Sequence, residues 1–299
     1  METRKLYYED PFQKGFATTV VSCDAVKGGY AVVLAETAFY PEGGGQPYDT
    51  GVLGEANVLE VHEKGGVITH LCDKPFEVGK SVSGKIDWAR RFDHMQQHSG
   101  EHICSGLICE RFHCDNVGFH MGADVVTIDF NADISWDELM EIEALANLYI
   151  YEDHPIDIQF YRGAELDKVE YRSKKPLEGD VRIVSFPGAD CCACCGTHVV
   201  RSGQVGLVKF LSVQKFRDGV RIELLSGKRA HRYLSECWAQ DVRIAQALSV
   251  KSNASFAGVE RVLAELSALK QRCAKLEESV FAQTAAQYEG KGDVLLFED

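Results

Sequence analysis

The chain has 299 residues, of which 45% are hydrophobic and 10% aromatic, a composition typical of folded globular proteins rather than disordered ones. Its formal net charge of −13 argues against a protein that coats nucleic acid without selectivity, because such binding neutralises many phosphates. The longest apolar runs, such as residues 30–35, are far shorter than the roughly 18 residues of a membrane span. The N-terminus has no apolar signal-peptide core, so we expect a cytoplasmic protein with no membrane contact.

Residues 1–86 are predicted to form a small β-barrel domain. Short runs with alternating apolar and polar residues are separated by Gly, Lys-Gly and Asp-Lys-Pro turns. These runs cover residues 17–23, 30–36, 56–62 and 67–72. Several short strands of this kind favour a barrel.

A glycine-rich loop lies within the predicted barrel domain. Gly43, Gly44 and Gly45 are consecutive and are followed by Gln46. Glycines permit positive φ angles and let the backbone approach a ligand closely, and the Gln amide both donates and accepts hydrogen bonds. A glycine-rich hairpin turn without a binding role is the alternative interpretation.

Residues 87–226 are predicted to form a second domain, with helices packed on an antiparallel sheet. A helical pattern runs from Asp87 to about Phe112. Ser135 and Glu138 form a capping-box pattern before a helix over residues 136–152. Strand patterns cover residues 125–133, 156–162, 181–186, 206–213 and 220–225. The fold class expected for the whole chain is therefore α+β.

Residues 227–290 are predicted to form a helical hairpin that ends in a coiled-coil arm. An apolar stripe with near-heptad spacing supports this prediction and is compatible with homodimerisation. The stripe consists of Val259, Leu263, Leu266, Leu269, Cys273, Leu276 and Val280. Residues 291–299 resemble the first strand of a further C-terminal domain that is cut off.

His98 and His102 lie four residues apart in the first predicted helix. This spacing places both imidazoles on one helix face, within reach of one divalent metal ion. Two structural histidines at the same spacing are the alternative. The intervening Gly100 favours a functional site, because glycine destabilises a helix by about 1 kcal/mol relative to alanine and a purely structural helix gains little from it.

Cys194 and His198 form a second pair, after a turn marked by Pro187 and Gly188. Cysteine and histidine are good zinc ligands, and two pairs from distant segments complete a tetrahedral set. The eleven cysteines are odd in number and the chain lacks an export signal, which favours reduced thiols over disulfides. The neighbouring Cys191, Cys192 and Cys195 are too crowded for all of them to ligate one ion with Cys194.

Three motifs together resemble the alanyl-tRNA editing proteins, which are relatives of the editing domain of alanyl-tRNA synthetase. The motifs are GGGQ at residues 43–46, RRxxxMQxHSGEH at residues 90–102 and CxGTH at residues 194–198. The resemblance covers roughly residues 5–225, and the helical arm resembles the long subclass of the family. Cys195 departs from the family pattern, in which glycine is usual there, and is an alternative ligand to Cys194.

The resemblance implies one Zn²⁺ per chain, held by His98, His102, Cys194 and His198. It also implies hydrolysis of the ester that joins serine or glycine to alanine tRNA. The Gly43–Gln46 loop is expected to close over the aminoacylated end. Gln46 and Glu101 are the candidate catalytic residues, and Gly43, Gly44, Gly45, Ser99 and Thr197 are the candidates for substrate binding.

Two other functions fit parts of the sequence. The pattern H-x-x-E-H at residues 98–102 also occurs in zinc peptidases, but this interpretation leaves Cys194, His198 and the glycine-rich loop unexplained. A non-catalytic RNA-binding module, in which zinc only joins two segments, is the other alternative. Residues 201–232 contain eight Lys or Arg and two acidic residues. This excess of positive charge indicates either a phosphate-facing strip or a solvated face.

Overall fold

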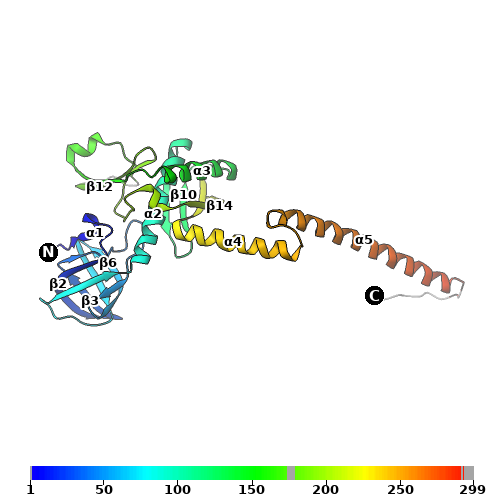
Figure 1. The fold of residues 1–299 in the computed structure, drawn as a ribbon, viewed down its shortest axis with the longest axis horizontal. Coiled ribbons are helices and arrows are strands. Elements are labelled where there is room, and N and C mark those ends of the chain that lie inside the picture. The colour runs from blue at the N-terminus through cyan, green and yellow to red at the C-terminus, as the bar shows by residue number, and fades with distance from the viewer. Residues whose placement is uncertain (1, 174–178, 291, 293–299) are drawn as a thin grey trace. The chain divides into compact units, whose positions relative to one another are not determined.

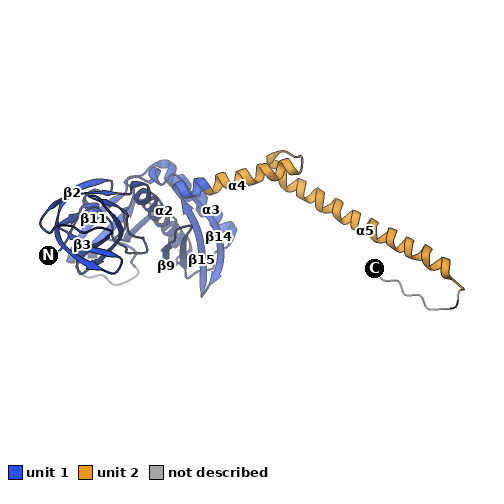
Figure 2. Ribbon diagram, turned by 90° about the horizontal axis from the view of Figure 1, so that it is seen from below, with its two compact units in different colours: residues 1–232 blue, residues 233–299 orange. Residues whose placement is uncertain are grey.

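The structure is a computed structural model that describes residues 2–173, 179–290 and 292. The chain forms two compact units, residues 1–232 and residues 233–299, shown in two colours in Figure 2. It combines helices with mainly antiparallel sheets, as predicted. None of the described helices is both long enough and apolar enough to cross a membrane.

Six N-terminal strands pair antiparallel in a closed order, β2-β3-β7-β6-β5-β8, and β8 returns to β2. Alternate residues of β2 are buried and exposed in its first half, so one face of the strand points into a core. The six strands, blue to cyan in Figure 1, are β2 (Gly15–Val26), β3 (Gly29–Leu34), β5 (Gly51–Leu53), β6 (Ala56–Lys64), β7 (Val67–Cys72) and β8 (Ser81–Ile86).

Three short elements accompany these strands. β1 (Arg4–Lys5) pairs in parallel with β4 (Glu36–Thr37), and the single helical turn α1 (Leu6–Glu9) follows β1. The chain between β4 and β5 contains the glycine-rich loop. The loop extends from the barrel strands and contacts β9 in the rest of the first unit.

The long helix α2 (Trp88–Phe112) carries the first predicted ligand pair. It begins where the side chain of Asp87 accepts a hydrogen bond from the backbone of Arg90, and it ends at His113, whose φ is 49°. A Cβ atom on Gly100 would lie 2.1 Å from Ser226 Oγ. Close packing is thus a sufficient reason for Gly100, so the inference that a structural helix has little use for this glycine was wrong.

Two sheets and a second helix complete the first unit. One sheet has the strand order β14-β15-β10-β9, the other the order β11-β12-β13, and α3 contacts β14 and α2. The elements are β9 (Asn116–Met121), β10 (Val126–Phe130), α3 (Trp136–Glu152), β11 (Asp157–Arg162), η1 (Gly163–Lys168), β12 (Asp180–Phe186), β13 (Asp190–Ala193), η2 (Ser202–Val205), β14 (Val208–Phe216) and β15 (Gly219–Ser226).

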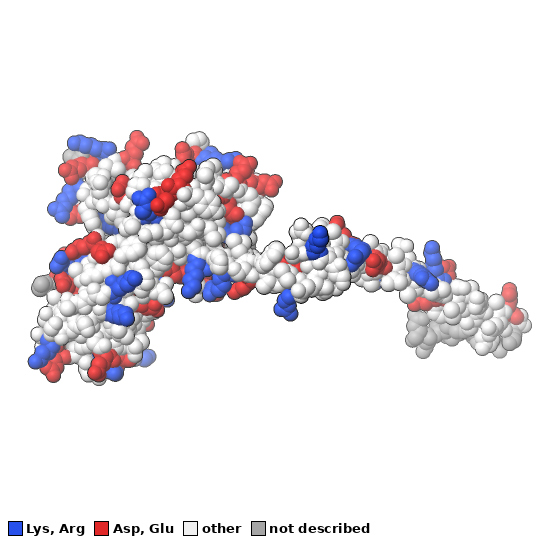
Figure 3. Space-filling view, viewed as in Figure 1, with Lys and Arg blue, Asp and Glu red and all other residues white. Residues whose placement is uncertain are grey.

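The first unit has two hydrophobic cores. One fills the space between the N-terminal strands, and the other lies between α2, α3 and the four-stranded sheet. Trp88 packs against both cores, two residues after the predicted domain boundary at residue 86. The surface of this unit in Figure 3 shows acidic and basic side chains interspersed.

The second unit is helical. α4 (Gly227–Ala247) begins in the first unit, and η3 (Ser252–Ala254) leads into α5 (Ser255–Tyr288). The apolar stripe of α5 is exposed, with Leu263 60% and Leu269 57% accessible. A helix is therefore present where the arm was expected, while coiled-coil pairing stays a prediction. Residues 291 and 293–299, the expected start of a further domain, lie outside the described residues.

Candidate metal centre

Four predicted ligands from two distant segments converge in the first unit. His98 and His102 come from α2, and Cys194 and His198 come from the segment that follows β13. One potential ligand atom of each residue lies within 4.8 Å of those of the other three. Cys194 Sγ is 3.4 Å from His98 Nε2 and 3.4 Å from His198 Nε2. The sequence spacing therefore identified a real side-chain cluster.

The Nδ1 atom of each imidazole is engaged outside the cluster. His98 Nδ1 lies 2.8 Å from Gln46 Oε1, and His102 Nδ1 lies 2.8 Å from Asp190 Oδ2. His198 Nδ1 lies 3.3 Å from Ser99 Oγ. Oxygen acceptors at Nδ1 favour the tautomer with the proton on Nδ1, which leaves the Nε2 lone pair for a metal.

The donor set and its spacing fit a tetrahedral ion. Three imidazoles and one thiolate are a common zinc donor set, with bond lengths of about 2.1 Å to nitrogen and 2.3 Å to sulfur. Tetrahedral geometry with these bonds separates nitrogen from sulfur by about 3.6 Å, close to the 3.4 Å found here. Metal-bound histidines usually donate their other ring N–H to a nearby oxygen. The oxygen atoms beside the three Nδ1 atoms match this arrangement.

The cluster favours a thiolate at Cys194. Burial raises the pKa of this thiol, but the neighbouring imidazoles of His98, His198 and His102 outweigh burial and hold its pKa well below the usual range. Burial lowers the pKa of His198 to about 3. For His102, burial is outweighed by Cys194 and Asp190, so its pKa is raised. A thiolate is the form that binds metals.

The turn after β13 needs a glycine at one position. A Cβ atom on Gly196 would lie 2.1 Å from His98 Cε1, and the Gly196 N–H is 3.3 Å from Cys194 Sγ. Any larger residue would displace the imidazole. The glycine therefore lets this segment pack directly against His98 of α2.

The neighbouring thiol of Cys195 faces another environment. The Cys195 side chain does not belong to the four-residue cluster. Its Sγ atom lies 3.9 Å from the Tyr40 hydroxyl. The Tyr8 hydroxyl donates to the Cys195 carbonyl at 3.1 Å. Cys192 forms a second possible group with His102 and Asp190. Cys194, rather than Cys195, is thus the thiol positioned beside the three imidazoles.

The glycine-rich loop packs on the same site. Gly43 and Gln46 exchange two backbone hydrogen bonds, and Met121 N donates to Gly45 O at 3.1 Å. A Cβ atom on Gly45 would lie 2.5 Å from the ring of Phe119, which itself stacks on His98 with 5.0 Å between ring centres. The loop therefore joins the barrel strands to the ligand helix through β9.

A cavity of about 520 Å³ opens beside the His/Cys cluster. Gly44 and Glu101 line it, whereas Gln46, Ser99 and Thr197 do not. Gln46 is fully buried, and its Oε1 accepts from Thr197 N while its Nε2 donates to Thr197 Oγ1. The other lining residues are His98, His102, Asn116, Val117, Gly118, Phe119, Arg172, Ser173, Cys192, Ala193, Cys194 and Cys195.

Sequence reasoning missed three polar residues of this site. Asp190 binds His102 and also accepts two hydrogen bonds from Arg172, at 2.7 and 2.8 Å. Asn116 Nδ2 donates to Glu101 Oε1 at 2.8 Å, as does Ser105 Oγ at 2.7 Å. Asp190 was detectable as a carboxylate inside the Cys/His motif, whereas Asn116 and Arg172 have no local signal.

Two family models match this chain. The model described as tRNA synthetases class II (A) matches residues 12–90, which contain the barrel strands and the glycine-rich loop. The model described as the threonyl and alanyl tRNA synthetase second additional domain matches residues 181–223, which contain Cys194 and His198.

Two curated relatives are similar over most of their own length. Alanyl-tRNA editing protein Aarsd1-A of Xenopus laevis is 30% identical over 95% of this chain and 73% of its own. Alanyl-tRNA editing protein AlaX-L of Pyrococcus horikoshii is 30% identical over 98% of this chain and 74% of its own. The chain belongs to the alanyl-tRNA editing protein family. The alanine–tRNA ligase of Pyrococcus abyssi is 35% identical over 98% of this chain, which spans 34% of the ligase.

Proposed function

We propose that this editing-family chain is a hydrolase that removes wrongly attached serine or glycine from alanine tRNA at a zinc site. The observation that carries the proposal is the cluster of three imidazoles and one thiol beside a cavity of about 520 Å³. Family membership supports the substrate class, because two relatives matched over 73% and 74% of their own length are alanyl-tRNA editing proteins.

His98, His102, Cys194 and His198 are the proposed zinc ligands. Bound zinc would supply a positive centre that attracts the amino group or polarises the ester carbonyl of the substrate. Gln46 and Asp190 hold two of the ligand imidazoles in place through Nδ1. Such contacts raise metal affinity by fixing the orientation of a ligand.

Glu101 is the proposed residue that orients the attacking water. Ser105 and Asn116 both donate to its Oε1 atom, which fixes the carboxylate at the cavity wall. Its Oε2 atom has no hydrogen-bond partner within residues 2–173 and 179–290 and is available to water. A fixed carboxylate can accept the proton of a water that attacks the ester.

The glycine-rich loop is proposed to receive the aminoacylated end of the tRNA. Gly44 lines the cavity, and Gly43 and Gly45 shape the turn. Ser99 and Thr197 are buried beside the ligands, where Ser99 Oγ contacts His198 and Thr197 holds Gln46. We therefore assign Gln46, Ser99 and Thr197 to positioning of the ligands rather than to direct contact with the substrate.

The peptidase alternative gains no support from this geometry. In a peptidase of the H-x-x-E-H type, the site contains two histidines and a distant carboxylate ligand. Here the two further groups beside the histidines are a thiol and a third imidazole. The thiol ligand distinguishes the two functions.

The test is single-turnover hydrolysis of alanine tRNA charged with either serine or alanine. The proposal predicts fast release of serine and a release of alanine at least about a hundredfold slower, because a site that hydrogen-bonds a hydroxyl rejects the analogue without it. The matched variants Cys194→Ser and Cys195→Ser separate the ligand thiol from its neighbour. Equal release of the two amino acids would contradict the proposed selectivity.

A further inference from the structure

The basic stretch of residues 201–232 is largely neutralised by acids from distant segments. Arg201 pairs with Asp153, Lys209 with Glu143 and Lys215 with Asp133. Arg221 and Arg229 likewise pair with Asp129 and Asp93. The stretch therefore does not form one continuous phosphate-facing strip. Its last three cations, Lys228, Arg229 and Arg232, instead line a single cavity.

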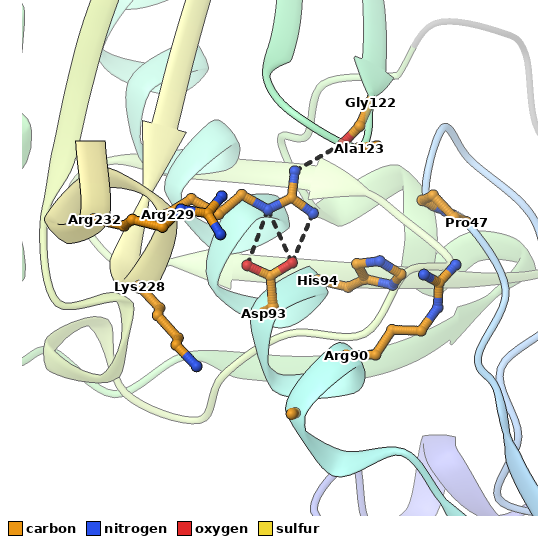
Figure 4. A pocket seen from close by; sticks show the side chains of 10 residues that line it. Pro47, Arg90, Asp93, His94, Gly122, Ala123, Lys228, Arg229 and Arg232 are labelled. Carbon is orange, nitrogen blue, oxygen red and sulfur yellow. Dashed lines mark hydrogen bonds and ion pairs between the residues drawn. The ribbon is translucent and has the colours of Figure 1, made fainter. Parts of the chain in front are cut away.

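This cavity has a volume of about 410 Å³ and lies between the first turns of α2 and α4. Figure 4 shows its lining side chains. Arg90 joins the three cations of α4, and Asp93 is the one carboxylate among the described lining residues. Asp93 is already bound by Arg229, so the remaining charge of the cavity is positive.

Arg90 is held so that one end of its guanidinium stays available. Its Nε atom donates to Tyr48 O at 2.9 Å, and the group lies 5.7 Å from the centre of the Tyr48 ring. Its terminal nitrogens have no hydrogen-bond partner in the described parts of the chain. A guanidinium presented in this way suits a phosphate oxygen.

His94 supplies a second, independent observation. Its side chain is only 3% exposed and lines the cavity beside Arg90, one helical turn away (Figure 4). Its Nδ1 atom is buried and has no partner among residues 2–173 and 179–290. Burial and the charges of Arg90 and Arg229 lower the pKa of His94 to about 3. A buried polar atom without a partner is uncommon and points to a missing ligand.

The cavity adjoins the candidate metal centre. Pro47, which lines it, directly follows the glycine-rich loop, and Gly44 of that loop lines the other cavity. His94 and His98 line the two cavities from successive turns of α2, about 6 Å apart along the helix. A polymer that places its end at the metal centre would therefore bring its adjacent backbone here.

We propose that this cavity binds a backbone phosphate of the RNA strand near its aminoacylated 3′ end. The inference rests on the proposed function for its choice of ligand, but its test does not require hydrolysis. Lys228 and Arg90 provide the charged contacts. Lys228 is exposed and its ammonium group has no partner within the described residues, so its replacement leaves the fold intact.

The experiment measures binding of an uncharged acceptor-stem hairpin of alanine tRNA with an unpaired 3′ end, at several salt concentrations. Lys228→Ala should weaken binding about five- to tenfold, as expected for one charge-assisted phosphate contact. It should also reduce the slope of log affinity against log salt by about 0.7. Lys228→Arg should restore both values.

Lys215→Ala is the matched control, because it removes the same charge from the same basic stretch at a residue paired with Asp133. It should change the affinity less than twofold. Equal effects of Lys228→Ala and Lys215→Ala would overturn the proposal. So would a loss of inorganic phosphate binding in Lys228→Ala with unchanged hairpin binding, which would indicate a site for free phosphate. Slow hydrolysis of charged tRNA by the wild type would contradict the proposed function alone.

Discussion

His98 Nδ1 lies 2.8 Å from Gln46 Oε1, although the two residues are 52 positions apart in the chain. Gln46 comes from the loop between the barrel strands, and His98 comes from the helix of the second core. This hydrogen bond makes the geometry of the candidate metal centre dependent on how the barrel strands present their loop. Removal of a partner of this kind usually lowers metal affinity by 10- to 100-fold.

Gln46→Ala should therefore weaken zinc binding by about 10- to 100-fold, with little loss of helix content. The measurement is a competition titration against a chelator of known affinity. Gln159→Ala is the control, since Gln159 is exposed on β11. Wild-type affinity in the Gln46 variant would show that the contact does not support the site.

The two adjacent cysteines should behave differently when replaced. Cys194→Ser should lose most zinc, because Cys194 Sγ lies 3.4 Å from two ligand imidazoles. Cys195→Ser should retain it, since Cys195 is outside the cluster. Zinc content after dialysis measures both, and a reversed order would assign the ligand to Cys195.

Gly196→Ala should damage the site without changing any ligand. The added Cβ atom would lie 2.1 Å from His98 Cε1, so the imidazole must move. We expect at least about tenfold weaker zinc binding, in line with loss of ligand orientation. Gly15→Ala is the control, because the nearest atom to its Cβ would be 3.6 Å away. Tight zinc binding by the Gly196 variant would mean that the turn adapts.

The buried pair of Arg91 and Asp49 should dominate the stability of the junction between the two cores. Both side chains are fully buried, and Arg91 also donates to the carbonyl oxygens of Ala38 and Pro11. Asp49→Ala leaves a buried guanidinium unpaired and should cost about 3–5 kcal/mol of unfolding free energy. Urea unfolding measures this.

The exposed pair of Arg162 and Asp180 offers the control for that change. Asp180→Ala should cost at most about 1 kcal/mol, as surface ion pairs do. Similar losses in the Asp49 and Asp180 variants would mean that burial of the first pair contributes nothing to stability.

Stability should fall in mild acid because of His70. Burial lowers the pKa of this fully buried histidine from 6.5 to about 4. Below pH 6.5 the unfolded chain binds a proton that the folded chain binds only near pH 4, so lowering the pH favours unfolding. The expected contribution between pH 7 and pH 5 is about 2 kcal/mol.

The measurement is urea unfolding of the wild type, His70→Gln and His62→Gln at the two pH values. His70→Gln should reduce the pH dependence, whereas His62→Gln, at an exposed position, should not. An unchanged pH dependence in the His70 variant would exclude this histidine as its source.

Local signals in the sequence were sufficient for several elements. α3 begins and ends where predicted, because Ser135 and Glu138 form the expected capping box. β9 was missed because Gly118 and polar residues interrupt its apolar alternation. β13 was missed because it is only four residues long and two of these are cysteines. Pairing with neighbouring strands, rather than local pattern, forms these two strands.

The cluster of His98, His102, Cys194 and His198 was predictable because each pair lies within five consecutive residues. The groups around the ligands were not, because they come from distant segments: Asp190 is 88 positions from His102, and Asn116 is 15 positions from Glu101. The buried partner of Arg91 had no signal at all. Contacts of this kind depend on the tertiary fold, so a single sequence does not indicate them.

The most direct test of the account is release of serine from serine-charged alanine tRNA by wild-type protein before and after zinc removal. We expect that chelation abolishes release and that added zinc restores it, while Cys194→Ser stays inactive under both conditions. Full activity of metal-free protein, verified by metal analysis, would contradict the proposed zinc-dependent hydrolase.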